Sequence, residues 1–134
     1  HIFPNAIGTL VTSCALVIPS MKDKMTGISY RVPVADVSLV DLNVLLKKET
    51  TYDEICKKMK EASETYMKGV LEYVDDEVVS SDFIGDSHTS IFDAREGIAV
   101  NDKLFKLIAF YDNEYGYSSK VLELIKHMYS VDNK

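Results

Sequence analysis

Apolar and polar residues alternate along several short segments of this chain, and that alternation predicts strands. The clearest case covers residues 37–46, where serine, aspartate and asparagine separate β-branched residues and leucines. Residues 104–111 form a denser apolar run, which is typical of a mostly buried strand. Shorter strands are predicted at residues 25–32, 70–73, 78–79 and 89–92.

Apolar residues recur at helical spacing in three other segments. Thr50 or Thr51 is predicted to cap a helix that runs to residue 65, because Asp53 and Glu54 follow in its first turn. The apolar stripe of this helix consists of Ile55, Met59, Ala62 and Tyr66. The other helices are predicted at residues 2–18, after a short opening turn, and at residues 119–128.

The predicted elements indicate an α+β fold. Two of these helices against four or five of the strands make a layer of helices on a sheet. Because successive strands lie close together in the chain, we expect a mostly antiparallel or mixed sheet with the helices on one face. A chain of 134 residues with 46% hydrophobic residues can build a core, and we expect residues 1–134 to form a single domain.

The composition argues against several classes of function. A formal net charge of −6 disfavours a nucleic-acid surface. One basic cluster lies among glutamates, and we interpret it as a solvated helix face. Its members are Lys47, Lys48, Lys57, Lys58 and Lys60. No apolar run reaches the roughly 18 residues of a membrane span, and no signal-peptide pattern opens the chain.

Cysteine, histidine and glycine positions narrow the choice further. The two cysteines, Cys14 and Cys56, give no disulfide framework, which favours a cytoplasmic address. The three histidines lie in no metal-ligand spacing, so we expect no metal site, and His88 is assigned to the surface. No two of the six glycines form a Gly-x-Gly, so these residues contain neither a dinucleotide fingerprint nor a P-loop.

The junction between the strand at 104–111 and the last helix carries the most specific pattern. Residues 111–118 read Tyr-Asp-Asn-Glu-Tyr-Gly-Tyr-Ser, and Asp112 and Asn113 stand at a strand end, where ligands of α/β proteins tend to bind. Other characteristic runs lie earlier in the chain, at residues 26–33, 37–42, 78–83, 90–94 and 97–102. In these runs, and over nearly its whole length, the chain resembles the catalytic domain of the glyceraldehyde-3-phosphate dehydrogenase family.

The resemblance implies the α+β catalytic-domain fold of that family. It also implies its activity, the NAD-dependent phosphorylating oxidation of glyceraldehyde 3-phosphate in glycolysis. In the family, the nucleophilic cysteine, its histidine and the NAD-binding domain all precede the region that this chain resembles. We therefore expect no catalytic residue here and no NAD bound by this chain alone. Cys14 lies in the first predicted helix and is interpreted as a small apolar residue.

The resemblance assigns binding roles to four residues. Arg31 matches an arginine that binds a phosphate, and Gly8 keeps a backbone N–H that can hold one. Asn113 matches the asparagine that holds the nicotinamide carboxamide, and Tyr117 matches the aromatic residue near the nicotinamide ring. From the residues alone, structural alternatives stay open: Arg31 could pair with a carboxylate, and the other two side chains could serve the turn and its packing.

The chain also departs from the family pattern. Ile7 stands where the family has a threonine whose hydroxyl helps to hold phosphate, and Arg95 and Glu96 replace a pair of small residues. A bulky charged pair at a small site suggests a lost packing constraint or a newly exposed surface. These changes favour a chain that lacks activity on its own.

Two functions therefore stay open. The first is a C-terminal piece of the enzyme that is inactive alone, and the alternative is a non-catalytic oligomerisation or interaction module derived from it. An enzyme of different chemistry has no supporting set of residues. In either case the apolar face of the last helix needs a cover, so we expect self-association or a full-length family subunit as the partner.

Overall fold

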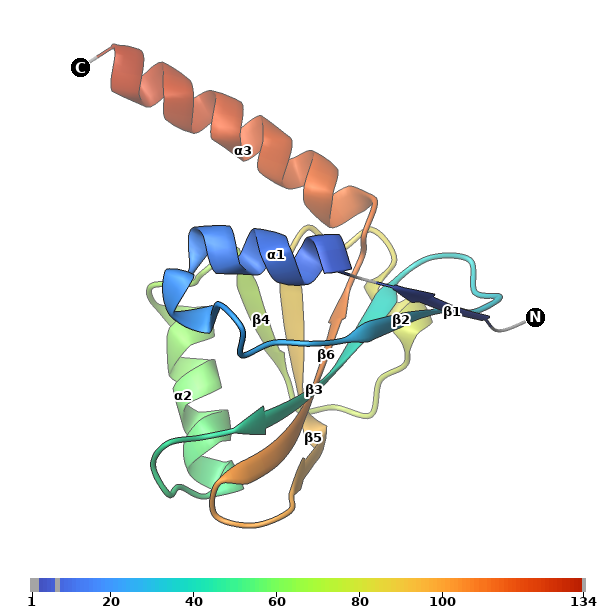
Figure 1. Ribbon diagram of the computed structural model, residues 1–134. Helices are drawn as coiled ribbons and strands as arrows, with labels where there is room; N and C mark the ends of the chain where they lie inside the picture. Colours follow the sequence, from blue (N-terminus) through green and yellow to red (C-terminus); the bar gives the residue numbers. More distant parts are fainter. Residues whose placement is uncertain (1–2, 7, 134) are drawn as a thin grey trace. The chain divides into compact units, whose positions relative to one another are not determined.

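The computed structural model describes residues 3–6 and 8–133, which fall into two compact units, one up to residue 35 and one from residue 36 onward. Figure 1 shows the elements of both. None of the helices in the described residues is long and apolar enough to span a bilayer. Each unit is treated separately below.

The first unit contains a two-stranded ribbon and a helix. Strand β1 (Phe3–Ala6) pairs antiparallel with β2 (Ile28–Arg31), and α1 (Gly8–Val17) and the short 3-10 helix η1 (Pro19–Met21) connect them. The prediction of an opening turn is therefore wrong for β1, because its ladder to β2 is formed with residues far along the chain. The predictions at Ile2 and Ile7 lie outside the described residues.

The second unit is built on a four-stranded mixed sheet (Figure 1) with the order β3-β6-β5-β4. Its strands are β3 (Ser38–Leu45), β4 (Leu71–Val74), β5 (Ser90–Ala99) and β6 (Leu104–Tyr111). The pairs β3–β6 and β5–β6 are antiparallel, whereas β4 and β5 are parallel. The α+β fold with a mixed sheet is confirmed.

Strand β5 continues beyond the predicted end at residue 92. Its register against β6 shifts between Asp93 and Ile98, which marks a bulge. The buried Asp93 carboxylate stabilises this bulge, because its Oδ1 accepts hydrogen bonds from the backbone N–H groups of Arg95 (2.9 Å) and Glu96 (3.3 Å). Arg95 and Glu96 are exposed, as their charge requires.

The short strand predicted at residues 78–79 is absent from the structure. Both valines lie in the loop before the 3-10 helix η2 (Ser80–Phe83). The backbone N–H of Val79 donates to Asp82 Oδ2 (2.8 Å), which fixes the start of η2 instead of a strand ladder. Val78 packs against the core, so its apolar character serves burial without a strand.

Helix α2 (Tyr52–Glu64) confirms the predicted cap at Thr51. The Thr51 hydroxyl accepts from the Glu54 N–H (3.2 Å), and the Glu54 carboxylate accepts from the Thr51 N–H (3.3 Å), which is a complete capping box. The predicted stripe is confirmed at Ile55, Met59 and Ala62, which pack into a core cluster. It is wrong at Tyr66, which is 80% exposed because the helix has already ended at Glu64.

Two core clusters occupy opposite faces of the sheet. Because side chains alternate along β6, Phe105 and Leu107 enter the cluster beneath α2, and Ile108 and Phe110 enter the other. Phe83 of η2 stacks on Phe110 with ring centroids 5.1 Å apart and closes the second cluster.

Helix α3 (Tyr115–Asp132) follows β6. It begins before and ends after the predicted residues 119–128. Lys120 fastens its start, because the Lys120 Nζ donates to the Gly69 carbonyl (2.7 Å) and pairs with Glu123 (2.8 Å). From residue 121 onward every described side chain of α3 is exposed. Its large apolar side chains are Val121, Leu122, Leu124, Ile125, Met128, Tyr129 and Val131.

Candidate functional site

The β6–α3 junction is organised around Asp112, which is 2% exposed. One carboxylate oxygen accepts from the backbone N–H groups of Glu114 (2.9 Å) and Tyr115 (2.7 Å), and the other accepts from the Gly85 N–H (2.8 Å). These bonds set the start of α3 and tie it to the loop after η2. Asp112 is therefore a structural residue, and the expectation that it meets a ligand is wrong.

The charge of Asp112 is stabilised where it lies. Burial raises the pKa of this carboxyl, but the backbone N–H groups of Tyr115, Gly85 and Glu114 lower it, and the net pKa lies below its usual value. A carboxylate held by several N–H donors stays ionised at neutral pH. The buried charge thus fixes the position of the residues that follow it.

Asn113 is exposed at the strand end, as its place in the sequence predicts. Its Oδ1 accepts a hydrogen bond from the Ser38 hydroxyl (3.1 Å), which ties the amide to the start of β3. No described residue accepts from the Asn113 Nδ2, and the residue as a whole is exposed. The amide is therefore held through its oxygen.

The start of β3 beside Asn113 is strained. Val37 has a φ of +67°, a left-handed conformation that β-branched residues rarely adopt. The side chain of Val37 is buried in the core, and its N–H donates to Asp36 Oδ1 (2.7 Å). Packing and this hydrogen bond hold the strained backbone immediately before Ser38, which orients Asn113. Strain of this kind clusters at functional sites.

Tyr117 lies in the first turn of α3, and 72% of its surface is exposed. Gly116 beside it is buried, and a Cβ there would come within 3.1 Å of the His88 carbonyl oxygen. The start of α3 therefore packs directly against the loop before β5. Tyr117 therefore projects from a well-anchored turn, and its ring is available for stacking.

The two residues assigned to phosphate lie in the first unit, at opposite ends of the ribbon. Gly8 opens α1 just after β1, at the end of the ribbon where Ala6 pairs with Ile28. Arg31 ends β2 opposite Phe3, is exposed, and forms no salt bridge with a described carboxylate. Within this ladder, Arg31 and the start of α1 therefore stand at different ends.

Both cysteines are free and partly buried. Cys56 lies on α2 beside Tyr52, whose hydroxyl donates to the Ala94 carbonyl (2.9 Å). Burial raises the pKa of the Cys56 thiol, with a smaller opposing effect from the Tyr52 hydrogen bond. A protonated thiol is a poor nucleophile, which agrees with a structural role for Cys56.

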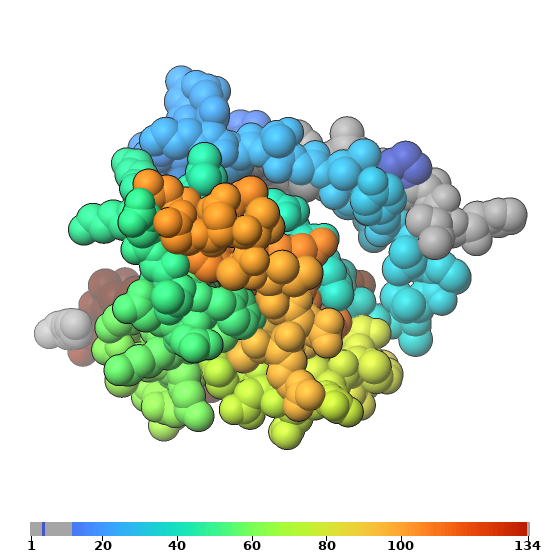
Figure 2. All heavy atoms as spheres, turned by 90° about the horizontal axis from the view of Figure 1, so that it is seen from below, coloured from blue at the N-terminus to red at the C-terminus, as the bar shows by residue number. Residues whose placement is uncertain are grey.

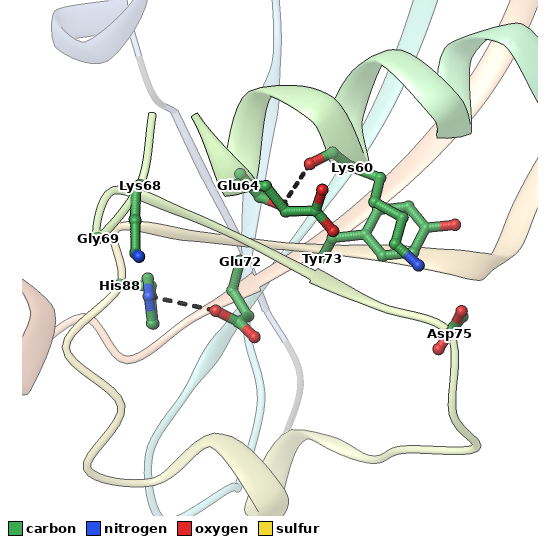
Figure 3. A pocket seen from close by; sticks show the side chains of 9 residues that line it. Lys60, Glu64, Lys68, Gly69, Glu72, Tyr73, Asp75 and His88 are labelled. Atoms are coloured by element: carbon green, nitrogen blue, oxygen red, sulfur yellow. Dashed lines mark hydrogen bonds and ion pairs between the residues drawn. The ribbon is translucent and has the colours of Figure 1, made fainter. Parts of the chain in front are cut away.

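His88 is not the simple surface residue that the sequence predicts. Its side chain is 25% exposed and lies between two carboxylates, with Nδ1 2.7 Å from Asp86 and Nε2 3.2 Å from Glu72. Figure 3 shows this imidazole at the edge of a polar pocket of about 470 Å³, beneath the end of α2. Lys60, Glu64, Lys68, Tyr73 and Asp75 also line this pocket.

This pocket holds none of the four predicted binding residues, and sequence reasoning missed it. Asp86 and His88 are close in the sequence, and their contact could be predicted as part of a turn. Glu72 lies on β4 and comes close to His88 only in the folded chain. Within the described residues no group of three or more histidine, cysteine, aspartate or glutamate side chains is arranged to hold a metal ion. Lysine and acidic side chains alternate around the pocket, so it presents no single charge.

Comparison with known proteins gives a consistent picture. Residues 1–113 match the family model described as "Glyceraldehyde 3-phosphate dehydrogenase, C-terminal domain". The glyceraldehyde-3-phosphate dehydrogenase of Chlamydia pneumoniae is 53% identical over 96% of this chain. A cytosolic glyceraldehyde-3-phosphate dehydrogenase of Arabidopsis thaliana is 55% identical over the same share, and glyceraldehyde-3-phosphate dehydrogenase 3 of Saccharomyces cerevisiae is 53% identical. The chain spans 38% of the length of each of these relatives.

Proposed function

This chain belongs to the C-terminal-domain family of glyceraldehyde-3-phosphate dehydrogenase, and we propose that its two units are parts of one catalytic domain. In an assembled enzyme this domain would serve the NAD-dependent phosphorylating oxidation of glyceraldehyde 3-phosphate. The oriented amide of Asn113 at the end of β6 is the observation that carries the proposal. High identity to relatives over nearly the whole chain supports it.

Asn113 and Tyr117 are proposed to meet the nicotinamide of NAD. The Asn113 Nδ2 has no described acceptor, and its Oδ1 is held by Ser38, so the amide can donate to a carboxamide oxygen without reorienting. The exposed Tyr117 ring offers an apolar surface on the same junction. When bound, NAD supplies the hydride acceptor, and the residues of this chain bind and orient the ring.

Arg31 and Gly8 are proposed to serve two separate anion positions. The reaction involves two phosphate groups, one on the substrate and one that attacks. A free guanidinium at the end of β2 suits one of them, because its planar fork pairs two phosphate oxygens. The first N–H groups of α1, which Gly8 opens, suit the other.

The 134 residues alone are proposed to be inactive. The described residues offer no cysteine–histidine pair, and the raised pKa of the Cys56 thiol opposes nucleophilic attack. No Gly-x-Gly is available for the pyrophosphate of NAD. Turnover would therefore need the remaining three fifths of an enzyme of the relatives' length. The cytosolic naming of an Arabidopsis thaliana relative supports a cytoplasmic address.

A chimera tests the proposal. This chain replaces the matching segment of the 53% identical Saccharomyces cerevisiae relative, and NADH formation is measured with each substrate varied. Asn113→Ala is expected to raise the KM for NAD about tenfold or more, and Arg31→Ala to do so for a phosphate-bearing substrate. Asn43→Ala and Arg95→Ala are matched controls on exposed positions and are expected to leave both constants unchanged.

Two outcomes would contradict the proposal. The first is a folded, NAD-binding chimera in which Asn113→Ala and Arg31→Ala behave like their controls. The second is a reversal of the two effects, in which Arg31→Ala changes the KM for NAD and leaves the KM for the phosphate-bearing substrate unchanged. Circular dichroism of every variant separates these outcomes from misfolding.

The unpartnered apolar face of α3 favours a second candidate, a non-catalytic interaction module. This helix exposes large apolar side chains over its outer turns, and Figure 1 shows it extending beyond the sheet from the end of β6. We expect the isolated chain to self-associate or to bind a full-length family subunit through this face. Sedimentation velocity that shows a compact monomer at micromolar concentration would oppose this candidate.

A further inference from the structure

A second pocket lies between the loop after β3 and the first turns of α2. It is an open groove of about 740 Å³. The β5–β6 loop supports it from behind, because the Leu46 N–H donates to the Lys103 carbonyl and the Thr50 N–H to the Asp102 carbonyl. In Figure 2 the orange spheres of this loop lie against the green spheres that carry the groove.

The floor of the groove is apolar. Leu46, Ile55 and Met59 line it and pack from behind against the buried cluster beneath α2. All three are partly buried, so the core holds them in place while part of each side chain faces the groove. A methionine adapts its shape to different apolar partners. The floor is therefore a preformed surface for apolar side chains.

The rim of the groove is basic. Lys47 and Lys48 come from the loop after β3, and Lys57 and Lys58 come from α2. Glu54 is the one acidic side chain among the lining residues. Four lysines on a chain with a formal charge of −6 make this a local reversal of sign.

Three nearby carboxylates, those of Glu54, Glu49 and Glu61, are already engaged. Glu54 accepts from the Thr50 hydroxyl (2.6 Å) and the Thr51 N–H (3.3 Å) within the capping box. Glu49 pairs with Lys103 (3.1 Å), and Glu61 pairs with Lys58 (2.6 Å).

Three of the rim lysines have no salt-bridge partner among the described residues. Within the described part of the chain, Lys47, Lys48 and Lys57 form no salt bridge, although Lys57 lies near enough to Glu54 and Glu61 to attract both. Positive charge therefore remains on both sides of the groove, which a partner with acidic groups along two edges would complement.

We propose that this groove binds an acidic amphipathic segment of a partner protein. The apolar floor takes the apolar side chains of the segment, and the lysine rims pair with acidic side chains along its edges. The openness of the groove selects this occupant over an acyl chain, because a single hydrocarbon chain would leave one side in water. An amphipathic segment presents its polar side there. The lysine stems add apolar wall while their ammonium groups stay hydrated.

Fluorescence anisotropy with the full chain tests the proposal. The probe is a fluorescein-labelled helical peptide of about 14 residues, with leucines at positions i, i+3, i+4 and i+7 and glutamates along both edges. We expect saturable binding that weakens as salt is raised. A peptide with serines in place of the leucines, and another with lysines in place of the glutamates, are each expected to bind at least about tenfold more weakly.

Charge-reversal variants locate the site. Lys47→Glu/Lys48→Glu/Lys57→Glu is expected to weaken the acidic peptide at least about tenfold. Lys22→Glu/Lys68→Glu/Lys126→Glu makes the same change in net charge at exposed positions elsewhere and is expected to retain affinity. All six positions are exposed, so the fold is expected to persist, and circular dichroism checks this.

Three results would overturn the proposal. One is equal affinity of the two triple variants for the acidic peptide. Another is absence of saturable peptide binding by the unmodified chain. The third is that sodium oleate binds and the peptide does not, with oleate binding weakened by the substitutions of the groove lysines. That result would assign the groove to an acyl chain.

Discussion

Replacing Asp112 with asparagine should destabilise the second unit without changing its shape. The Asp112 carboxylate accepts three backbone N–H bonds from two segments, the loop at Gly85 and the start of α3. An asparagine keeps one oxygen for the Glu114 and Tyr115 N–H groups, but its NH2 then faces the Gly85 N–H. That places two donors against each other in a site that is 2% exposed.

The expected loss follows from the bonds removed. A buried donor left without an acceptor costs about 1–3 kcal/mol, and the two remaining bonds lose the strength that a charged acceptor gives. We expect Asp112→Asn to lower the free energy of unfolding by about 3 kcal/mol in total. For a chain of this size, that corresponds to a fall in Tm on the order of 10 °C.

Urea unfolding followed by far-UV circular dichroism measures this loss. Asp76→Asn is the matched control, because Asp76 is exposed, and it is expected to change stability by less than about 0.5 kcal/mol. An Asp112→Asn variant as stable as this control would refute the role assigned to the three bonds.

The pH dependence gives a second, independent readout. The pKa of Asp112 is lowered on folding, so its charge contributes stability above the unfolded pKa, which lies near 3.8. This contribution is lost as the pH falls through the lower pKa of the folded state. We therefore expect the unmodified chain to lose stability more steeply below about pH 4 than Asp112→Asn does.

Three further substitutions test other parts of the second unit. Thr51→Ala removes the acceptor for the Glu54 N–H and should cost about 1 kcal/mol in urea unfolding, and Glu54→Ala should add a further loss, because the Thr51 N–H and the Thr50 hydroxyl still donate to the Glu54 carboxylate. Gly97→Ala places a methyl group onto the Tyr52 ring and should cost about 1–3 kcal/mol, an effect that Tyr52→Ala relieves in the double variant. Phe92→Ala opens a cavity at a side chain that is 2% exposed and should cost about 3–5 kcal/mol, whereas a loss below 1 kcal/mol would contradict its place in the core.

Local signals made the best predictions of the fold. Helix α2 was predictable because its cap at Thr51 and its stripe at Ile55, Met59 and Ala62 depend on residues within four positions of each other. The mixed sheet was predictable because β3 and β6 carry clear apolar patterns.

Elements that depend on distant partners were predicted poorly. Strand β1 exists through its ladder to β2, whose sequence lies more than twenty residues away. The second half of β5 depends on the buried Asp93 side chain, which stabilises the bulge from within. Nothing local distinguishes such an aspartate from a turn residue, so the strand was expected to end before it.

The residues of the candidate site show the same difference between local information and dependence on distant partners. The exposure of Asn113 at the strand end was predictable, because its position after the apolar run of β6 is local information. The burial of its neighbour Asp112 was not predictable, since one of its donors is Gly85 from a loop far back in the chain. His88 was misplaced for the same reason, because Glu72 reaches it from β4.

The inactivity proposed for these 134 residues is tested by the rate of NADH formation by the purified chain. The assay supplies NAD, glyceraldehyde 3-phosphate and inorganic phosphate. We expect no rate above the blank, because the described residues offer no cysteine–histidine pair. Turnover by this chain would refute the proposed inactivity, and its loss in Cys14→Ser would identify Cys14 as the nucleophile.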